Sequence, residues 1–229
     1  MISVLTLTYK RKEFLEEAIY SFLNQNNLES SDEMVIINDN KDAEYHFDHP
    51  NIKIINLKER FESISSKIEW GYKQCKCDYI YRLDDDDLLA PWGIENTKKD
   101  ILNNPNYDIY RSEKVYFFVN NILKGTNGSV NNGNVYTKKY LDRIKFTDQS
   151  GDEDVYITFE NYGKIYESKL KPTMIYRWGM STYHISVIKK KNNKELYDYI
   201  DSRYFHQDGK LILNPHFKND YYKIIESID

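Results

Sequence analysis

The sequence predicts an α/β protein with a Rossmann-like, mostly parallel central sheet flanked by helices. Apolar runs at Ile2 to Thr8, Met34 to Ile37 and Ile52 to Leu57 are typical of buried strands. A fourth run, Asp78 to Leu83, ends in the consecutive aspartates Asp84 to Asp87. Segments with helical spacing lie between these runs, and alternating strands and helices pair in parallel through right-handed crossovers. We therefore expect a nucleotide-binding half in the first ~100 residues.

Helices are expected after the first and third strands. After Tyr9-Lys10-Arg11, apolar residues recur at helical spacing: Phe14, Leu15, Ala18, Ile19, Phe22 and Leu23. A second helix is predicted from about Arg60 to Lys76, directly before the fourth strand. The polar residues that follow the strands would then gather at the carboxyl edge of the sheet, where open α/β sheets bind ligands.

The second half of the sequence predicts a smaller region in which strands and helices are mixed. Strand-like pieces at Asp108 to Val119 and Ile122 to Lys124 flank an Asn120-Asn121 turn. Helical spacing returns around Tyr136 to Ile144 and from Asp152 to Tyr162. Beyond residue 184 lies a lysine-rich run, which we interpret as a solvated linker or helix face.

Composition limits the classes of function. The 229 residues, 40% of them hydrophobic and 30% charged, suit one globular domain with a modest appendage. A net charge of -4 argues against a protein that grips duplex nucleic acid by neutralising phosphates. No run of 18 apolar residues occurs, so we expect no transmembrane segment and a cytoplasmic protein.

The two cysteines, Cys75 and Cys77, give no sign of a metal site. Their C-x-C spacing lacks a second cysteine pair that would complete a four-sulfur zinc site. Small buried thiols at the end of a helix are the expected structure. Reduced thiols also fit a cytoplasmic setting.

The aspartate run is the most informative motif. Adjacent carboxylates raise one another's pKa unless a positive charge lies among them, so a cluster at a strand end suggests a bound hard cation. A calcium loop of the EF-hand kind fails at Leu88 and Leu89, where an oxygen ligand and a glycine are needed. A solvated acidic turn that caps the next helix remains an alternative. A G-x-G-x-x-G turn and a Walker loop are both absent.

Five segments match known motifs in the same order along the chain. The opening Ser3-Val4-Leu5-Thr6-Leu7-Thr8-Tyr9-Lys10-Arg11 resembles "SVVIPTYNR", and Val35-Ile36-Ile37-Asn38-Asp39-Asn40 resembles "VVDDGS". Cys77 to Pro91 resembles "GDYILFLDADDxxxP", Glu153-Asp154 matches an "ED" pair, and Tyr176 to Ser181 resembles "YRxHxxS". Over roughly residues 2 to 184, the chain therefore resembles an inverting family 2 glycosyltransferase of the GT-A fold.

The resemblance implies domains and donor-site residues. It implies a GT-A domain over 1–184, with a nucleotide-sugar half (1–100) and an acceptor half (101–184), and a helical extension over 185–229. Thr8, Tyr9 and Asp39 would line the nucleobase pocket, and Asp84 and Asp85 would face the ribose and the sugar. The predicted donor-binding set is completed by Arg11, Lys67 and Arg177.

The resemblance also implies the metal and the catalytic residues. Asp86 would bind Mn²⁺ or Mg²⁺, with Asp84 and His184 as further ligands, and Asp154, paired with Glu153, would be the catalytic base. The sequence departs from the family pattern at Asn38 and Lys10 and in the register of Lys67, and His184 lies several residues late. The alternative for Glu153 and Asp154 is that they complement the dipole of the helix they begin.

These roles match the chemistry of glycosyl transfer. A divalent ion neutralises the departing diphosphate, and a partly buried carboxylate accepts the proton of the acceptor hydroxyl. We expect a donor linked to uridine diphosphate (UDP), an acceptor that is a carbohydrate or another hydroxyl compound, and inversion. The alternatives are a sugar nucleotidyltransferase, a non-catalytic nucleotide- or carbohydrate-binding module of the same fold, and an enzyme that glucosylates nucleic acid. A homo-oligomer is compatible with this sequence.

Overall fold

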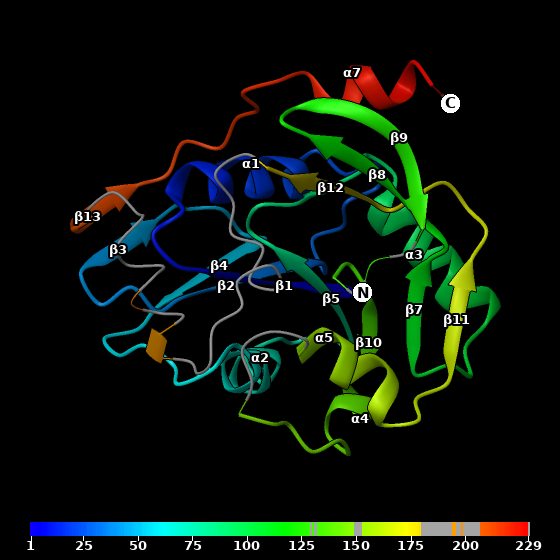
Figure 1. The fold of residues 1–229 in the computed structure, drawn as a ribbon, viewed down its shortest axis with the longest axis horizontal. Coiled ribbons are helices and arrows are strands. Elements are labelled where there is room, and N and C mark those ends of the chain that lie inside the picture. The colour runs from blue at the N-terminus through cyan, green and yellow to red at the C-terminus, as the bar shows by residue number, and fades with distance from the viewer. Residues whose placement is uncertain are drawn as a thin grey trace.

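The computed structural model describes residues 1–128, 130, 132–148, 153–179, 194–195, 198 and 207–228. Its central sheet has seven strands in the order β11-β7-β10-β5-β1-β2-β4 (Figure 1). Parallel pairing joins β1 (Ile2–Thr8), β2 (Glu33–Asn38), β4 (Ile52–Asn56) and β5 (Tyr79–Asp84). The predicted mostly parallel α/β sheet is confirmed.

The remaining strands of this sheet come from the second half of the chain. β10 (Val135–Thr137) runs antiparallel to both β5 and β7 (Ile109–Ser112), and β11 (Ile165–Ser168) pairs in parallel with β7. The second half therefore extends the sheet that the first half begins.

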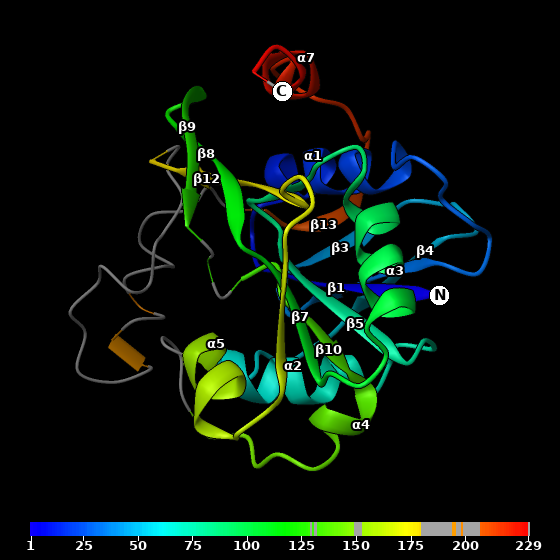
Figure 2. The same cartoon turned by 90° about the vertical axis from the view of Figure 1, so that its right-hand side faces the viewer.

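Helices cover both faces of the sheet, which gives three layers (Figure 2). α1 (Lys12–Leu23) and α3 (Gly93–Asn103) lie on one face. The opposite face carries α2 (Ile64–Tyr72), α4 (Lys138–Leu141) and α5 (Glu153–Val155), which continues into the wider π-helical turn Tyr156–Glu160. Side chains of β1 alternate between the two layers, because Val4 joins the α1 cluster and Leu5 joins the α2 cluster.

A smaller sheet lies beside the carboxyl edge of β5. Its order is β6-β12-β8-β9, formed by β6 (Leu88–Leu89), β12 (Met174–Trp178), β8 (Lys114–Val119) and β9 (Ile122–Gly128). The predicted Asn120-Asn121 turn connects β8 to β9, and both asparagines have positive φ, 48° and 65°. Asparagine tolerates this left-handed conformation better than most residues do.

The described part of the segment 185–229 contains a strand as well as a helix. β13 (Gly209–Ile212) pairs in parallel with β3 (Ala43–His46), and α7 (Tyr221–Glu226) packs on the smaller sheet through Tyr221 and Ile225. The lysine-rich run and His184 lie outside the described residues.

Several element boundaries differ from the sequence predictions, and two of these differences have a clear physical reason. The helix expected from Arg60 starts at Ile64, because the Ser63 hydroxyl accepts a hydrogen bond from the Ser66 backbone N–H and the Ser66 hydroxyl bonds back to Ser63. Tyr136 has helical spacing with later residues, yet it lies in β10 because its backbone pairs with Ile80. Tertiary pairing outweighs the local pattern there.

The expected buried thiols are confirmed. Cys75 and Cys77 are both free and buried just after α2, as expected, and burial raises the pKa of the Cys75 thiol to about 12. None of the described helices is long and apolar enough to cross a bilayer.

Candidate functional site

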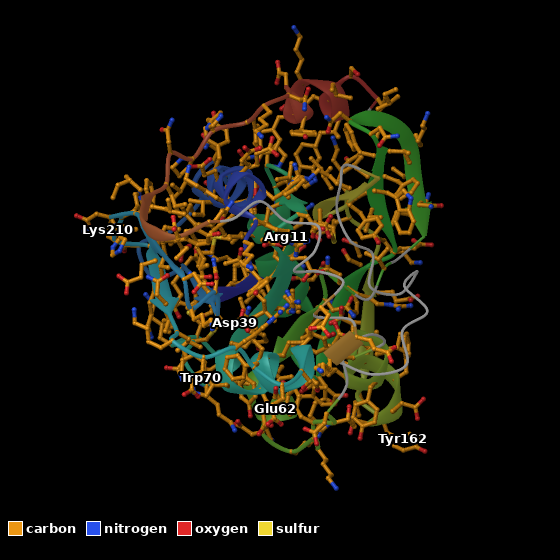
Figure 3. The ribbon with its side chains drawn as sticks, turned by 60° about the vertical axis from the view of Figure 1, so that its left-hand side comes forward. Arg11, Asp39, Glu62, Trp70, Tyr162 and Lys210 are labelled. Carbon is orange, nitrogen blue, oxygen red and sulfur yellow. The ribbon has the colours of Figure 1, made fainter. Side chains whose placement is uncertain are left out.

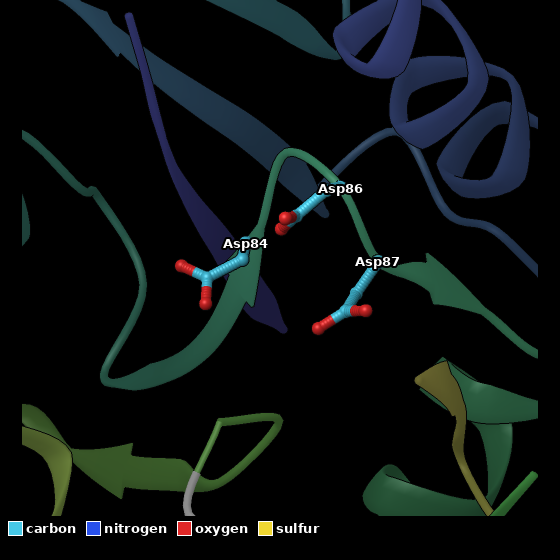
Figure 4. A group of neighbouring side chains, drawn as sticks. All are labelled: Asp84, Asp86 and Asp87. Atoms are coloured by element: carbon cyan, nitrogen blue, oxygen red, sulfur yellow. The ribbon is translucent and has the colours of Figure 1, made fainter. Parts of the chain in front are cut away.

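The aspartate run forms a tight turn at the carboxyl end of β5. Asp84 ends the strand, and the Asp87 N–H donates to the Asp84 carbonyl oxygen at 3.1 Å before β6 begins. Carboxylate oxygens of Asp84, Asp86 and Asp87 lie within 4.8 Å of one another, and Figure 4 shows these side chains around one space. An all-oxygen, carboxylate donor set is what Mg²⁺ and Mn²⁺ prefer, so these residues fit such an ion.

Two arginines contact the turn from the sides. Arg11 forms ion pairs with Asp85 and Asp86, the latter at 2.9 Å, and Arg82 pairs with Asp84 at 2.5 Å. Burial raises the pKa of Asp85 to about 6, against the lowering effect of Arg11. Burial, followed by the charges of Asp86 and Asp84, raises the pKa of Asp87. After burial, the neighbouring aspartates add to the rise in the pKa of Asp85 and of Asp87, and a bound cation would offset this mutual repulsion.

Arg177 lies behind the turn and has no exposed surface. Its Nε donates to the Asp86 carbonyl oxygen, its backbone N–H donates to Asp87 Oδ1 at 2.8 Å, and its Nη1 pairs with Glu17 Oε2 at 2.5 Å. Its Nη1 also lies 3.3 Å from the Tyr221 hydroxyl. The predicted donor-binding arginine is thus placed where it ties the turn to α1 and α7.

The predicted catalytic pair begins α5 on the other side of Arg82. Glu153 is buried and Asp154 is half-buried. Oδ1 of Asp154 is shielded from solvent and finds no hydrogen-bond partner among the described residues. Burial and then the charge of Glu153 raise the pKa of Asp154 to about 8, while Arg82 lowers it. A carboxylate with a raised pKa and an unused oxygen is suited to accept a proton.

Arg82 is a residue that the motif analysis passed over. Its side chain is 4% exposed, and its Nε and Nη1 lack hydrogen-bond partners within the described part of the chain. Burial lowers the pKa of Arg82, but the charges of Asp84, Asp154 and Glu153 together raise it above its ordinary value. Arg82 thus lies within electrostatic reach of both the metal-type carboxylates and the predicted base. The available sequence signal was an arginine inside an otherwise apolar buried strand.

The predicted nucleobase residues meet at the ends of β1 and β2. Asp39 follows β2, and its Oδ1 accepts from Lys67 Nζ at 2.5 Å while its Oδ2 accepts from the Phe61 N–H at 3.2 Å. Lys67 Nζ also donates to the Thr8 carbonyl oxygen at 2.9 Å. The predicted residues Thr8, Asp39 and Lys67 are therefore brought together, with Lys67 beside Asp39.

Tyr9 and Arg11 complete this side of the site. The guanidinium carbon of Arg60 lies 3.7 Å from the centroid of the Tyr9 ring, a cation–π contact. Arg11 and Asp39 lie on the same side of the molecule in Figure 3, whereas Tyr162 lies at its far edge. The carboxyl ends of β1, β2 and β5 thus carry the residues predicted to contact the nucleobase and the carboxylate turn on neighbouring strands.

Comparison with known proteins gives one family match. The model of the family described as glycosyl transferase family 2 matches residues 3–162. No curated protein matches the chain.

Several solved structures share the fold. TarS 1-349 from S. aureus in complex with UDP-GlcNAc has a TM-score of 0.68 and 15% identity, covering 82% of this chain and 61% of that one. The mannosyltransferase PcManGT from Pyrobaculum calidifontis, in complex with GDP-Man and Mn²⁺, has a TM-score of 0.59 and 14% identity, covering 80% and 58%. The chain thus spans about three fifths of the length of the structures that it matches.

Proposed function

Because the chain belongs to glycosyl transferase family 2, we propose that it moves a sugar from a nucleoside diphosphate sugar to an acceptor hydroxyl, with inversion. The observation that carries this proposal is the meeting of three groups at one sheet edge: the Asp39–Lys67–Thr8 cluster, the carboxylate turn, and Asp154 within electrostatic reach of Arg82 and Asp84. Ligands of open α/β sheets bind at this edge.

The carboxylate turn is proposed to hold a divalent ion through Asp86 and Asp84. When bound, Mn²⁺ or Mg²⁺ supplies positive charge that stabilises the departing diphosphate. Arg11 forms ion pairs with Asp85 and Asp86, which keeps a further positive charge beside the carboxylate turn. Hydrogen bonds fix the buried carboxylates of the turn. Asp85 accepts one from Arg11 Nε, and Asp87 accepts from Asn132 Nδ2 and from the Arg177 backbone N–H.

The nucleobase is proposed to lie by Asp39. Lys67 and the Phe61 N–H fix that carboxylate, and each of its oxygens keeps a second lone pair for an imide N–H, which uracil and thymine carry and cytosine lacks. This selects a uridine- or thymidine-linked donor. Structures of this fold hold a uridine nucleotide in S. aureus TarS and GDP-Man in PcManGT, so the proposed base preference rests on Asp39.

Asp154 is proposed to be the general base. Its Oδ1, which has no hydrogen-bond partner among the described residues, accepts the proton of the acceptor hydroxyl. The acceptor oxygen forms its bond to the anomeric carbon as the bond between that carbon and the diphosphate breaks. Attack from the face opposite the leaving group inverts the configuration. Arg82 stabilises the ionised form of Asp154, since it lowers the pKa of this carboxyl.

The direct test is a panel of UDP-, dTDP-, GDP- and CDP-linked sugars incubated with the protein and Mn²⁺. We expect nucleoside diphosphate release that is fastest with a UDP or dTDP donor and is abolished by excess chelator. Release of pyrophosphate from a sugar phosphate and a nucleoside triphosphate would instead identify a nucleotidyltransferase. Binding without turnover of any donor would identify a non-catalytic module.

A further inference from the structure

The two faces of the smaller sheet differ in burial. Side chains of neighbouring parallel strands that share a register position share a face, and β12 pairs with β8 at Ile175↔Tyr116, Tyr176↔Phe117 and Arg177↔Phe118. One face therefore carries Ile175, Arg177, Tyr116 and Phe118, all without exposed surface and packed toward α7. The opposite face carries Tyr176 and Phe117, which are half-buried, followed by the half-buried pair Trp178 and Val119.

The aromatic residues of that second face form a continuous strip. The rings of Phe117 and Tyr176 are stacked, with centroids 5.9 Å apart and planes inclined by 16°. Trp178 follows on the same face at the next register position of that face, opposite Val119. We call Phe117, Tyr176 and Trp178 the aromatic strip.

The strip begins beside the carboxylates of the site. The peptide that joins Tyr176 to Arg177 donates its N–H to Asp87 Oδ1 at 2.8 Å, and Ile175 pairs with Leu88, the residue after the aspartate run. After burial, the charges of Asp87, Asp86, Asp84 and Asp154 all raise the pKa of the Tyr176 phenol. Tyr176 therefore lies within electrostatic reach of both the aspartate turn and the proposed base.

The aromatic strip leads away from the aspartate turn. From Tyr176, β12 continues away from its pairing with β6 to Trp178, whose carbonyl oxygen accepts from the Asn120 N–H at the β8–β9 turn. The aspartate turn is the place of the diphosphate in the proposed function. The strip therefore leads away from the proposed place of the diphosphate, so a molecule bound on it would be the acceptor and not the donor nucleotide.

We propose that the acceptor is itself a carbohydrate, and that the aromatic strip binds a pyranose ring of it on Tyr176. This inference rests on the proposed function, whose acceptor class it specifies. A pyranose has a face of C–H groups, and the electron-rich face of an aromatic ring attracts such groups while excluding water from them. The Phe117 ring, nearly parallel to that of Tyr176, adds a second aromatic ring to the same face. Tyr176 is thus a binding residue for the acceptor.

The test is saturation-transfer NMR with the methyl pyranosides of glucose, galactose and N-acetylglucosamine. Glycerol serves as a hydroxyl compound without a ring. Each probe is measured against the protein alone and against the protein with UDP and Mn²⁺. The variants are Tyr176→Phe, which keeps the ring, Tyr176→Leu, which keeps apolar bulk without a ring, and the control Tyr162→Ala, which alters an aromatic residue that is 93% exposed at the far edge of the molecule.

We expect at least one pyranoside, and not glycerol, to receive saturation from the wild-type protein, Tyr176→Phe and Tyr162→Ala. Tyr176→Leu should weaken that contact by roughly tenfold while UDP binding in Mn²⁺ stays unchanged. Equal pyranoside binding by wild type and Tyr176→Leu, or no pyranoside binding while UDP binds, would overturn the inference and leave the proposed function standing. A Tyr176-dependent pyranoside contact in a protein that does not bind UDP would support the inference and contradict the proposed donor.

Discussion

At the scale of single residues, Asp154 and Asp86 show how position separates two carboxylates of the same type. Asp86 lies in a turn of carboxylates and pairs with Arg11. Asp154 is the second residue of a short helix, where burial raises its pKa to about 8 and its Oδ1 has no hydrogen-bond partner within the described part of the chain. A group that is to bind a cation is best kept ionised, whereas a base works best with a pKa near the working pH.

The first prediction concerns Asp154→Asn. An amide keeps the size and hydrogen-bonding capacity of the side chain but accepts no proton, so we expect turnover to fall roughly 10²-fold or more at near-constant donor affinity. Steady-state kinetics of nucleoside diphosphate release, together with UDP titration, measure the two quantities. If Asp154→Asn transfers normally and Glu153→Gln is inactive, Glu153 and not Asp154 is the catalytic base.

The pH dependence has a definite sign. The base must be ionised, and the pKa of Asp154 is raised, so its competent fraction grows as pH rises. We predict that kcat/KM increases with pH, with a midpoint well above the ordinary carboxyl range, and that the residual rate of Asp154→Asn lacks this limb. A flat wild-type profile between pH 5 and 8 would argue against this assignment.

At the scale of secondary-structure elements, buried polar contacts decide where helices begin and how they are joined. Ser63 has no exposed surface, and its hydroxyl caps α2, which carries Lys67 just after its first turn. The cap thereby fixes where Lys67 stands relative to Asp39.

We predict that Ser63→Ala lowers the free energy of unfolding by about 1 kcal/mol. The helix N-terminus then loses an acceptor for the Ser66 N–H. Urea denaturation measures the change, and Ser63→Thr, which keeps a hydroxyl, is the matched control. Equal stability of Ser63→Ala and wild type would show that water replaces the cap.

The contact between Arg177 and Glu17 joins β12 to α1 across the core. The two side chains are 0% and 2% exposed, so removing one leaves the other charge buried and uncompensated. We predict a loss of about 3 to 5 kcal/mol for Arg177→Met, with a smaller loss for the double variant Arg177→Met/Glu17→Gln than the sum of the single changes. Denaturant titration of the cycle measures this coupling.

The exposed pair of Lys169 and Glu113 supplies the control for that cycle. Both side chains reach solvent, at 72% and 47% exposed, so Lys169→Met should change stability little. Additive effects in the Arg177 and Glu17 cycle would mean that the buried pair contributes no coupling.

At the scale of the whole molecule, the features that could be predicted were those that depend on residues close together in the sequence. β1 was predicted with its observed bounds, because seven buried residues in succession mark a strand with both faces covered. The strands β1, β2, β4 and β5, the helices α1 and α2, the carboxylate turn and the family were also predicted from short segments, whereas α3 was not. These features depend on neighbours along the chain.

Features that depend on distant partners were not predictable. β3 pairs with β13, more than 160 residues later, and neither segment is apolar enough to mark a strand on its own. The role of Arg177 depends on Glu17, 160 positions away in the sequence. The electrostatic effect of Asp154 on Tyr176 and on Arg82 likewise could not be predicted, because the fold brings these residues near one another from distant parts of the sequence.

The central claim is that the carboxylate turn binds the diphosphate of the donor through a divalent ion held by Asp86. Isothermal titration of UDP into the protein, with Mn²⁺ and again with excess chelator, tests it most directly when wild type is compared with Asp86→Ala and the control Tyr162→Ala. We predict binding in Mn²⁺ that is lost in chelator and in Asp86→Ala but kept in Tyr162→Ala. UDP affinity that is the same in chelator, or the same in Asp86→Ala, would contradict the claim.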